Sequence, residues 1–182
     1  VSIGLLLFWP LLLIISLVVL LTAGRPVLFV QKRAGLGKKP FAIYKFRTMY
    51  IGADKDQKKF LQLNEAPSPM FKIYDDPRFI GIGRFLSRTG LDELPQIANI
   101  LKGEMSLVGP RPLPVREAKK LGQNWENRFA VKPGIFSEWS VYTNRHHSKR
   151  EWLKLEKKTL EKGSWGYDLE IIVKTLFKLV FD

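Results

Sequence analysis

The sequence predicts an α+β fold in which an apolar N-terminal membrane helix is followed by a small β-hairpin and several amphipathic helices. Three observations support this prediction. Residues 3–21 are almost entirely apolar, two alternating stretches flank a glycine-rich turn at 35–40, and helical patterns of apolar residues recur from residue 80 onward. We therefore divide the 182-residue chain into a membrane helix at 1–24 and a cytoplasmic domain at 25–182.

The first predicted element is a helix through the apolar run 3–21. A helix of this length extends about 28 Å, which is close to the hydrocarbon thickness of a bilayer. Pro10 removes one helical hydrogen bond and kinks or breaks the helix near its middle. Two shapes follow: a kinked helix that crosses the membrane, which the sequence alone favours, or a helix–break–helix that enters and leaves on one face. The basic residues from Arg25 onward place the next domain on the cytoplasmic side.

The charge of the chain is strongly positive, with a formal net charge of +13. Seven basic residues and no acidic residue fall between Arg25 and Met49. Such a balance indicates an anionic partner, which is a nucleic acid, a phosphorylated substrate or an acidic lipid headgroup. The helical, zinc-finger and RNP signatures of nucleic-acid binders do not occur, so we expect no nucleic-acid partner. The absence of cysteine excludes disulfide bonds and thiolate metal sites.

A β-hairpin is predicted directly after the apolar run. Residues 27–30 and 41–46 alternate between apolar and other side chains, and the glycine-rich, lysine-tipped segment 35–40 between them fits a turn. Lys45 and Arg47 lie two residues apart, so they share a face of the second strand. That face is either solvated or directed into an anion site.

The central stretch of the sequence contains an adjacent acid pair, Asp92 and Glu93. Pro95 fits the first turn of a helix and Gly103 fits its left-handed end, so the pair is predicted at a helix N-terminus, where anions are stabilised. A preceding short helix from residue 80 is expected to deliver Arg88 beside the pair. An ordinary helix cap is the alternative interpretation of an isolated acid pair.

Three further helices are predicted in the C-terminal third of the chain, at 114–130, 149–162 and 168–181, with irregular structure at 135–148. The second of these helices is strongly charged, as is typical of a solvated face. The last one has an apolar stripe, which either packs on the domain core or lies on the membrane surface.

Four sequence strings occur in an order that resembles the bacterial monotopic phosphoglycosyl transferases, a family of sugar transferases that begin glycan assembly. The resemblance covers nearly the whole chain. The strings are Lys-Phe-Arg-Thr-Met at 45–49, Asp-Pro-Arg at 76–78, Leu-Asp-Glu-Leu-Pro-Gln at 91–96 and Met-Ser-Leu-Val-Gly-Pro-Arg-Pro at 105–112.

The resemblance implies a fold, an activity and a location. The N-terminal segment would be a re-entrant helix, broken at Pro10, that stays in one leaflet of the bacterial inner membrane, and we adopt this shape over the spanning helix. The cytoplasmic catalytic domain would transfer a sugar 1-phosphate from a nucleotide diphosphate sugar, expected to be a UDP-sugar, to polyprenyl (undecaprenyl) phosphate. The products would be polyprenyl-diphosphate-sugar and UMP. A homodimer is left open.

The resemblance also implies roles for individual residues. Asp92 would be the catalytic nucleophile that forms a covalent phosphosugar intermediate, and Glu93, with Asp92, would hold Mg²⁺. The physical argument agrees, because a metal and basic side chains neutralise a pyrophosphate so that a carboxylate can attack phosphorus. The expected substrate-binding residues are Lys45, Arg47, Arg88, Pro110, Arg111, Pro112 and Arg145.

This sequence departs from the family pattern at several positions. Trp9, not serine, precedes Pro10, and residues 135–141 keep Trp139 while lacking the expected glycine and glutamine. Glu156 stands where the family pattern has aspartate. These departures motivate one rival hypothesis, a catalytically inactive membrane scaffold. A basic anchor that only binds anionic lipid, and a phosphatase or nuclease with the same acid pair, are the other rivals.

Overall fold

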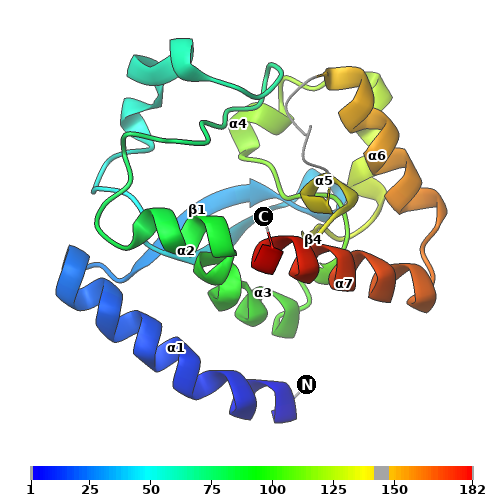
Figure 1. Ribbon diagram of the computed structural model, residues 1–182. Helices are drawn as coiled ribbons and strands as arrows, with labels where there is room; N and C mark the ends of the chain where they lie inside the picture. The colour runs from blue at the N-terminus through cyan, green and yellow to red at the C-terminus, as the bar shows by residue number, and fades with distance from the viewer. Residues whose placement is uncertain (1, 142–147, 182) are drawn as a thin grey trace.

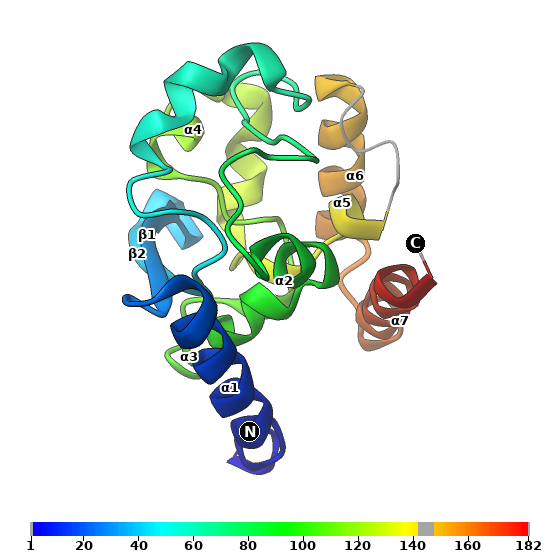
Figure 2. The same cartoon turned by 60° about the vertical axis from the view of Figure 1, so that its left-hand side comes forward.

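The fold is known from a computed structural model that describes residues 2–141 and 148–181, with side chains described for 9–141 and 148–178. It is an α+β arrangement of helices around two small sheets, as predicted (Figure 1). Helix α1, Ser2–Ala23, extends away from the rest of the domain, which is most easily seen in Figure 2. In the same view, helices α6, Lys149–Glu161, and α7, Trp165–Phe181, lie on the opposite side of the domain from the hairpin.

Helix α1 is continuous, and Pro10 lies inside it. The chain therefore does not form two separate helices around Pro10, which differs from the helix–break–helix expectation. A proline removes only one backbone donor, and the turns on either side can retain helical geometry. In the part of the chain whose side chains are described, no helix is long and apolar enough to cross a membrane. The re-entrant insertion stays a prediction.

The predicted hairpin is confirmed, with longer strands than the sequence patterns indicate. Strand β1 spans Leu28–Ala34 and strand β2 spans Pro40–Phe46, and the two pair antiparallel. A short 3₁₀ helix, η1, at Leu36–Lys38 lies in the turn that connects them. The register places Phe29 opposite Lys45, so these side chains and others two residues apart share one face.

A run of short helices follows the hairpin. Residues of the long connection form the 3₁₀ helix η2, Lys55–Leu63, and the predicted short helix is α2, Gly83–Thr89. Next come the 3₁₀ helix η3, Leu91–Gln96, and helix α3, Ile97–Leu101. Gly103 has a φ of 73°, so the predicted left-handed helix end is confirmed.

A second, two-stranded sheet was not predicted. Strand β3 spans Ser106–Val108 and pairs parallel with β4, Gly134–Phe136, which lies in the segment predicted to be irregular. A side chain at Gly109 or Gly134 would collide with the backbone of the other segment, at 2.6 Å and 2.1 Å respectively. The missing side chains therefore allow these two segments to meet.

The predicted helix over 114–130 is wrong. The chain forms helix α4, Val115–Ala118, and the 3₁₀ helix η4, Gln123–Ala130, because Gly122 between them is extended. Helix α5 is Glu138–Val141, and the last two predicted helices are confirmed as α6 and α7.

The main core cluster lies between η4, α5 and α6. Trp152 of α6 is almost fully buried, with its ring centroid 4.5 Å from that of Trp125 and 5.3 Å from that of Trp139. One face of α6 is therefore buried, while most of its charged residues form the predicted solvated face. A second cluster joins α1 to the hairpin and α2 through Ile15, Val19, Phe46 and Leu86.

Candidate active site

The acid pair lies in the first turn of η3, as the sequence predicts for a helix N-terminus. Gly90, with a φ of 70°, occupies the cap position itself, so neither carboxylate acts as the N-cap. The side chain environment is also unlike that of a surface cap, because Asp92 is only 6% exposed and Glu93 is half-buried. Two adjacent carboxylates are thus held largely away from water.

Two basic residues from distant parts of the chain approach the pair. Lys45 Nζ, on β2, lies 2.5 Å from Glu93 Oε1 and 3.8 Å from Asp92 Oδ2. Arg111 Nη2 lies 3.4 Å from the same Glu93 oxygen. Three of the sequence strings, around residues 45, 92 and 111, therefore meet at one place.

The two carboxylates have different electrostatic environments. Burial raises the pKa of Asp92 to about 6; Lys45 opposes this rise, and the negative charge of Glu93 adds to it. Burial also disfavours the charged form of Glu93, but Lys45 and Arg111 outweigh it and lower the pKa of Glu93 to about 2. Glu93 is consequently the firmly ionised member of the pair, and Asp92 is the carboxylate whose charge is least compensated.

A cavity of about 540 Å³ opens beside the acid pair. Asp92, Lys45 and Arg111 line it, and Trp139 and Trp152 contribute to its apolar lining. This volume is in the range of pockets that hold small ligands, and its combination of apolar walls with a few convergent charges is typical of such pockets.

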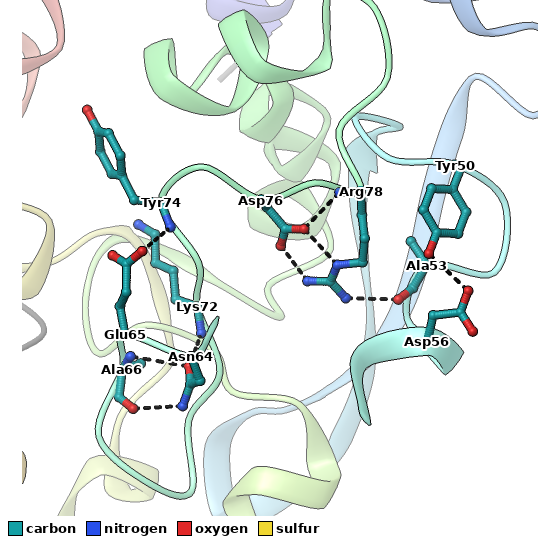
Figure 3. Close-up of polar contacts among 10 residues, drawn as sticks. All are labelled: Tyr50, Ala53, Asp56, Asn64, Glu65, Ala66, Lys72, Tyr74, Asp76 and Arg78. Atoms are coloured by element: carbon teal, nitrogen blue, oxygen red, sulfur yellow. Dashed lines mark hydrogen bonds and ion pairs between the residues drawn. The ribbon is translucent and has the colours of Figure 1, made fainter. Parts of the chain in front are cut away.

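One wall of the cavity is formed by the segment between β2 and α2, and buried polar contacts hold this segment in place (Figure 3). Asp76 and Arg78 are both buried and ion-paired, with Arg78 Nε 2.8 Å from Asp76 Oδ1. Arg78 Nη1 also donates to the carbonyl oxygen of Ala53 at 2.8 Å. Asn64 connects two parts of its loop, because its Nδ2 donates to the Ala66 carbonyl and its Oδ1 accepts from Lys72 N. The Asp-Pro-Arg string thus has a structural role in shaping the cavity.

The loop that carries Arg111 is fixed by contacts on both sides. The backbone carbonyl of Arg111 accepts a hydrogen bond from Arg128 Nη2 at 2.5 Å, and that of Pro110 accepts one from Gly134 N at 3.1 Å. Arg128 is itself buried against Glu156, at 3.0 Å. Pro110 and Pro112, on either side of Arg111 in this loop, are buried, and their role in substrate binding stays a prediction.

Arg47 does not join the acid pair, although the sequence predicts it on the same face as Lys45. Its side chain is 6% exposed, and its guanidinium donates to the carbonyl oxygens of Pro26, Ala23 and Gly24. These are the free carbonyls at and after the end of α1, which basic side chains commonly satisfy. Arg47 therefore anchors the end of α1 while also lining the cavity, and its role in substrate binding stays a prediction.

Arg88 is also placed away from the acid pair. Its guanidinium lies 2.9 Å from the exposed carboxylate of Asp75 and stacks over the ring of Tyr74, at 4.8 Å from the ring centroid. Among the described residues, its ion pair is with Asp75 and not with Asp92 or Glu93. Helix α2 was predicted correctly, but Arg88 in its C-terminal turn contacts Asp75, which lies in the loop that precedes α2. Arg145 lies outside the described residues.

Arg33 reaches the site, and the sequence analysis did not single it out. It lies on β1 on the same face as Phe29, which is opposite Lys45, so the alternation of the strand carries the signal. Its side chain lines the cavity with Lys45 and Arg111, and its Nη1 donates to the carbonyl of Pro112 at 2.9 Å.

The acid pair is also the best candidate for a metal site. No group of three or more histidine, aspartate and glutamate side chains gathers among the described residues. Mg²⁺, however, is commonly held by one or two carboxylates together with substrate phosphates and water. The hard oxygen donors of Asp92, which lines the cavity, and of the adjacent Glu93 fit that pattern.

An acid pair of unequal pKa, flanked by a lysine and an arginine beside a cavity, is typical of a functional site. The chain belongs to the bacterial sugar transferase family, whose model matches residues 1–182. The resemblance identified from the four sequence strings is thereby confirmed.

Several curated relatives are similar to this chain. It is 40% identical over 154 residues to the galactosyl transferase CpsE of Streptococcus agalactiae, covering 84% of this chain and 34% of the relative. It is 35% identical over 182 residues to the UDP-glucose:undecaprenyl-phosphate glucose-1-phosphate transferase of Escherichia coli, covering 96% and 37%. It is 32% identical to the exopolysaccharide production protein ExoY of Rhizobium meliloti, covering 96% and 79%. The chain thus spans about a third of the length of the first two relatives and most of the third.

Proposed function

We propose that this chain transfers a sugar 1-phosphate from a UDP-sugar to undecaprenyl phosphate, giving undecaprenyl-diphosphate-sugar and UMP. The observation that carries the proposal is the position of Asp92, Lys45 and Arg111 at one cavity, with Glu93 ion-paired to both basic residues. Relatives named for this reaction support the choice of donor and acceptor. The product would be a lipid-linked sugar at the first membrane step of glycan or exopolysaccharide synthesis.

The chemistry proposed for Asp92 is nucleophilic. A carboxylate oxygen of Asp92 attacks the phosphorus attached to the sugar, and the bond from that phosphorus to the bridging oxygen breaks, so that UMP leaves. A phosphosugar ester on Asp92 remains. An oxygen of undecaprenyl phosphate then attacks the same phosphorus and releases the Asp92 carboxylate. The weak compensation of its charge suits Asp92 to this role, whereas Glu93 is already engaged by Lys45.

The basic side chains serve the phosphates of the donor. Arg111 is 38% exposed at its side chain and has one loose contact with Glu93, so it can fork onto phosphate oxygens. Mg²⁺ would be held by Asp92 and Glu93, and when bound it would neutralise charge on the diphosphate. The Lys45 ammonium contacts Glu93 closely and Asp92 more distantly, so it holds the two carboxylates together.

The apolar outer faces of two helices support a position at the membrane. Leu13, Ile14, Leu17 and Leu21 of α1 are exposed, and so are Leu169, Val173, Leu176 and Phe177 of α7. Buried residues on the other face of α7, including Ile171, pack on the domain. Helix α7 therefore packs on the domain through one face, as the first alternative predicts, and exposes an apolar stripe on the other. We assign α1 to one leaflet of the inner membrane and α7 to its cytoplasmic surface.

The test is release of UMP by the protein purified in nanodiscs with undecaprenyl phosphate and Mg²⁺. A panel of UDP-sugars is supplied to the wild type, to Asp92→Asn and to the surface control Asp75→Asn. We expect UMP from one sugar donor, dependent on the lipid phosphate, lost in Asp92→Asn and kept in Asp75→Asn. If the folded wild type released no UMP with any sugar in the panel, the proposal would be rejected in favour of the inactive scaffold.

The same samples separate the remaining rivals. A basic anchor would bind anionic vesicles in a salt-dependent way, indifferent to Asp92 and without releasing UMP. A phosphatase or nuclease would release inorganic phosphate or cleaved nucleic acid and would form no lipid product. Extraction and chromatography of the lipid phase therefore distinguish transfer from hydrolysis.

A further inference from the structure

We propose that Arg33 is a third cation of the phosphate site, where its guanidinium binds the diphosphate of a nucleoside diphosphate sugar beside Lys45 and Arg111. This inference rests on the proposed function. It adds the substrate group that Arg33 recognises, whereas the side chains of Arg47 and Arg88 are bonded to the end of α1 and to Asp75.

The position of Arg33 supports this role. The antiparallel register puts it on the face of the hairpin that also carries Gln31, Phe29 and Lys45, and all four line the cavity. Arg33 is joined to the Arg111 loop, because its Nη1 donates to Pro112 and the next residue, Ala34, donates its N–H to the carbonyl of Leu113. The end of β1 and the loop therefore present two guanidinium groups to one space.

The bonding of Arg33 is incomplete. One nitrogen contacts the Pro112 carbonyl, whereas Nε is buried without a hydrogen-bond partner. Among the described residues, Arg33 has no carboxylate within ion-pair distance, although Glu117 and Glu93 lie near enough to act on its charge. A buried donor normally has a hydrogen-bond partner, and the planar donor edge of a guanidinium suits phosphate oxygens.

The electrostatics agree with the geometry. Burial lowers the pKa of Arg33 to about 10, and the neighbouring positive charge of Arg111 contributes to the decrease. Arg33 remains charged at neutral pH, so two like charges face each other at the cavity. An anion between them removes that repulsion, and a diphosphate has enough oxygens to contact both.

The competing explanation is that Arg33 has only a structural role, because it also donates a hydrogen bond to the Pro112 carbonyl. The two roles separate in binding experiments with UDP and uridine, which differ only in the diphosphate. Loss of a structural contact would weaken the binding of both compounds, whereas loss of a phosphate-binding side chain would weaken the binding of UDP alone. Direct titration of the purified protein gives both dissociation constants without relying on turnover.

The variants are Arg33→Gln, Arg33→Lys and the matched control Lys32→Gln, which removes a charge from the exposed outer face of the same strand. For Arg33→Gln we expect the Kd of UDP and the donor KM to rise by roughly 10- to 100-fold. The Kd of uridine should stay within about twofold, which separates phosphate recognition from general damage to the site. Arg33→Lys should keep the charge and recover part of the UDP affinity, and Lys32→Gln should resemble the wild type.

Two results would overturn the role of Arg33: equal loss of UDP and uridine affinity, or an unchanged Kd for UDP in folded Arg33→Gln. If Arg33→Gln does not fold, the ratio of UDP to uridine affinity in Arg33→Lys decides, and an unchanged ratio rejects the role. If the wild type binds UDP through Arg33 but releases no UMP with any donor, the proposed function fails while the inference about Arg33 stands.

Discussion

The ammonium group of Lys45 lies 2.5 Å from the carboxylate of Glu93 and 3.8 Å from that of Asp92. The lysine therefore favours one member of the acid pair over the other. Glu93 has its charge satisfied by two cations, whereas burial leaves the charge of Asp92 only partly compensated. This asymmetry underlies the assignment of Asp92 as nucleophile and of Glu93 as its supporting carboxylate.

The raised pKa of Asp92 predicts that its charge destabilises the fold at neutral pH. Because the folded protein holds this proton more tightly than the unfolded chain, stability is lost as pH rises from about 4 to about 6. In a chelator, so that no metal is bound, Asp92→Asn should be more stable than the wild type at pH 7 by on the order of 1–3 kcal/mol.

Denaturant unfolding at two pH values checks this prediction. The gain from Asp92→Asn should shrink near pH 4, where the wild-type carboxyl is neutral as well. Asp75→Asn is the control, because the same change at an exposed position should leave stability nearly unchanged. A variant that is less stable than the wild type at neutral pH would show that the buried charge is fully compensated.

Metal binding at the acid pair predicts a stabilising effect of Mg²⁺ that depends on Glu93. Saturating Mg²⁺ with UDP should raise the Tm of the wild type by about 2–4 °C, because a ligand that binds only the folded state stabilises it. Glu93→Gln should remove most of this rise. Glu126→Gln, which changes an exposed glutamate paired with Lys38, should retain it. A full response in Glu93→Gln would place the metal elsewhere.

The contacts of Arg47 predict a defect in stability and not in substrate binding. Arg47→Met leaves the carbonyls of Ala23, Gly24 and Pro26 without their buried donor, which should destabilise the protein by about 2–3 kcal/mol. The donor KM of the folded fraction should match that of the wild type. The exposed control Arg25→Met should alter neither quantity. A large increase in KM with unchanged stability would restore the sequence-based role of Arg47.

Asn99 joins helix α3 to strand β2, which carries Lys45, by hydrogen bonds. It is fully buried; its Oδ1 accepts from Tyr44 N at 3.3 Å, and its Nδ2 donates to the Ala42 carbonyl at 2.7 Å and to Glu104 at 2.8 Å. Asn99→Asp replaces this donor with a charged acceptor facing two acceptors, so a loss of roughly 2–4 kcal/mol in stability is expected.

A double-mutant cycle provides the check on Asn99. The amide introduced by Glu104→Gln can donate to the carboxylate introduced by Asn99→Asp, whereas the original glutamate cannot. The second change should therefore recover part of the stability that the first one loses. Strict additivity of the two changes would mean that the Asn99–Glu104 hydrogen bond contributes nothing measurable to joining the elements.

The parts of the fold that could be predicted depend on local sequence. The hairpin follows from alternation around a glycine-rich turn, and the end of α3 follows from Gly103, since both signals lie within the element itself. The β3–β4 pairing could not be predicted in this way. Its strands are short and lie far apart in the sequence, so their partners are decided by tertiary packing.

The site shows the same division. Asp92 and Glu93 were located correctly, because Pro95 and the string around them indicate a helix start. Arg47 and Arg88 were misplaced because their partners, the end of α1 and Asp75, are determined by how separate elements pack. Strand alternation would have placed Arg33 on the face of Phe29 if the strand had been extended beyond residue 30, and only the hairpin register relates that face to Lys45.

The central claim is that Asp92 carries the sugar phosphate during transfer. The most direct test supplies the productive UDP-sugar, radiolabelled in the phosphate attached to the sugar, to the protein without undecaprenyl phosphate. We expect labelled protein, with the label on the peptide containing Asp92 and discharged when undecaprenyl phosphate is added. Lipid product formed by a protein that never acquires label, or label on a peptide without Asp92, would contradict it.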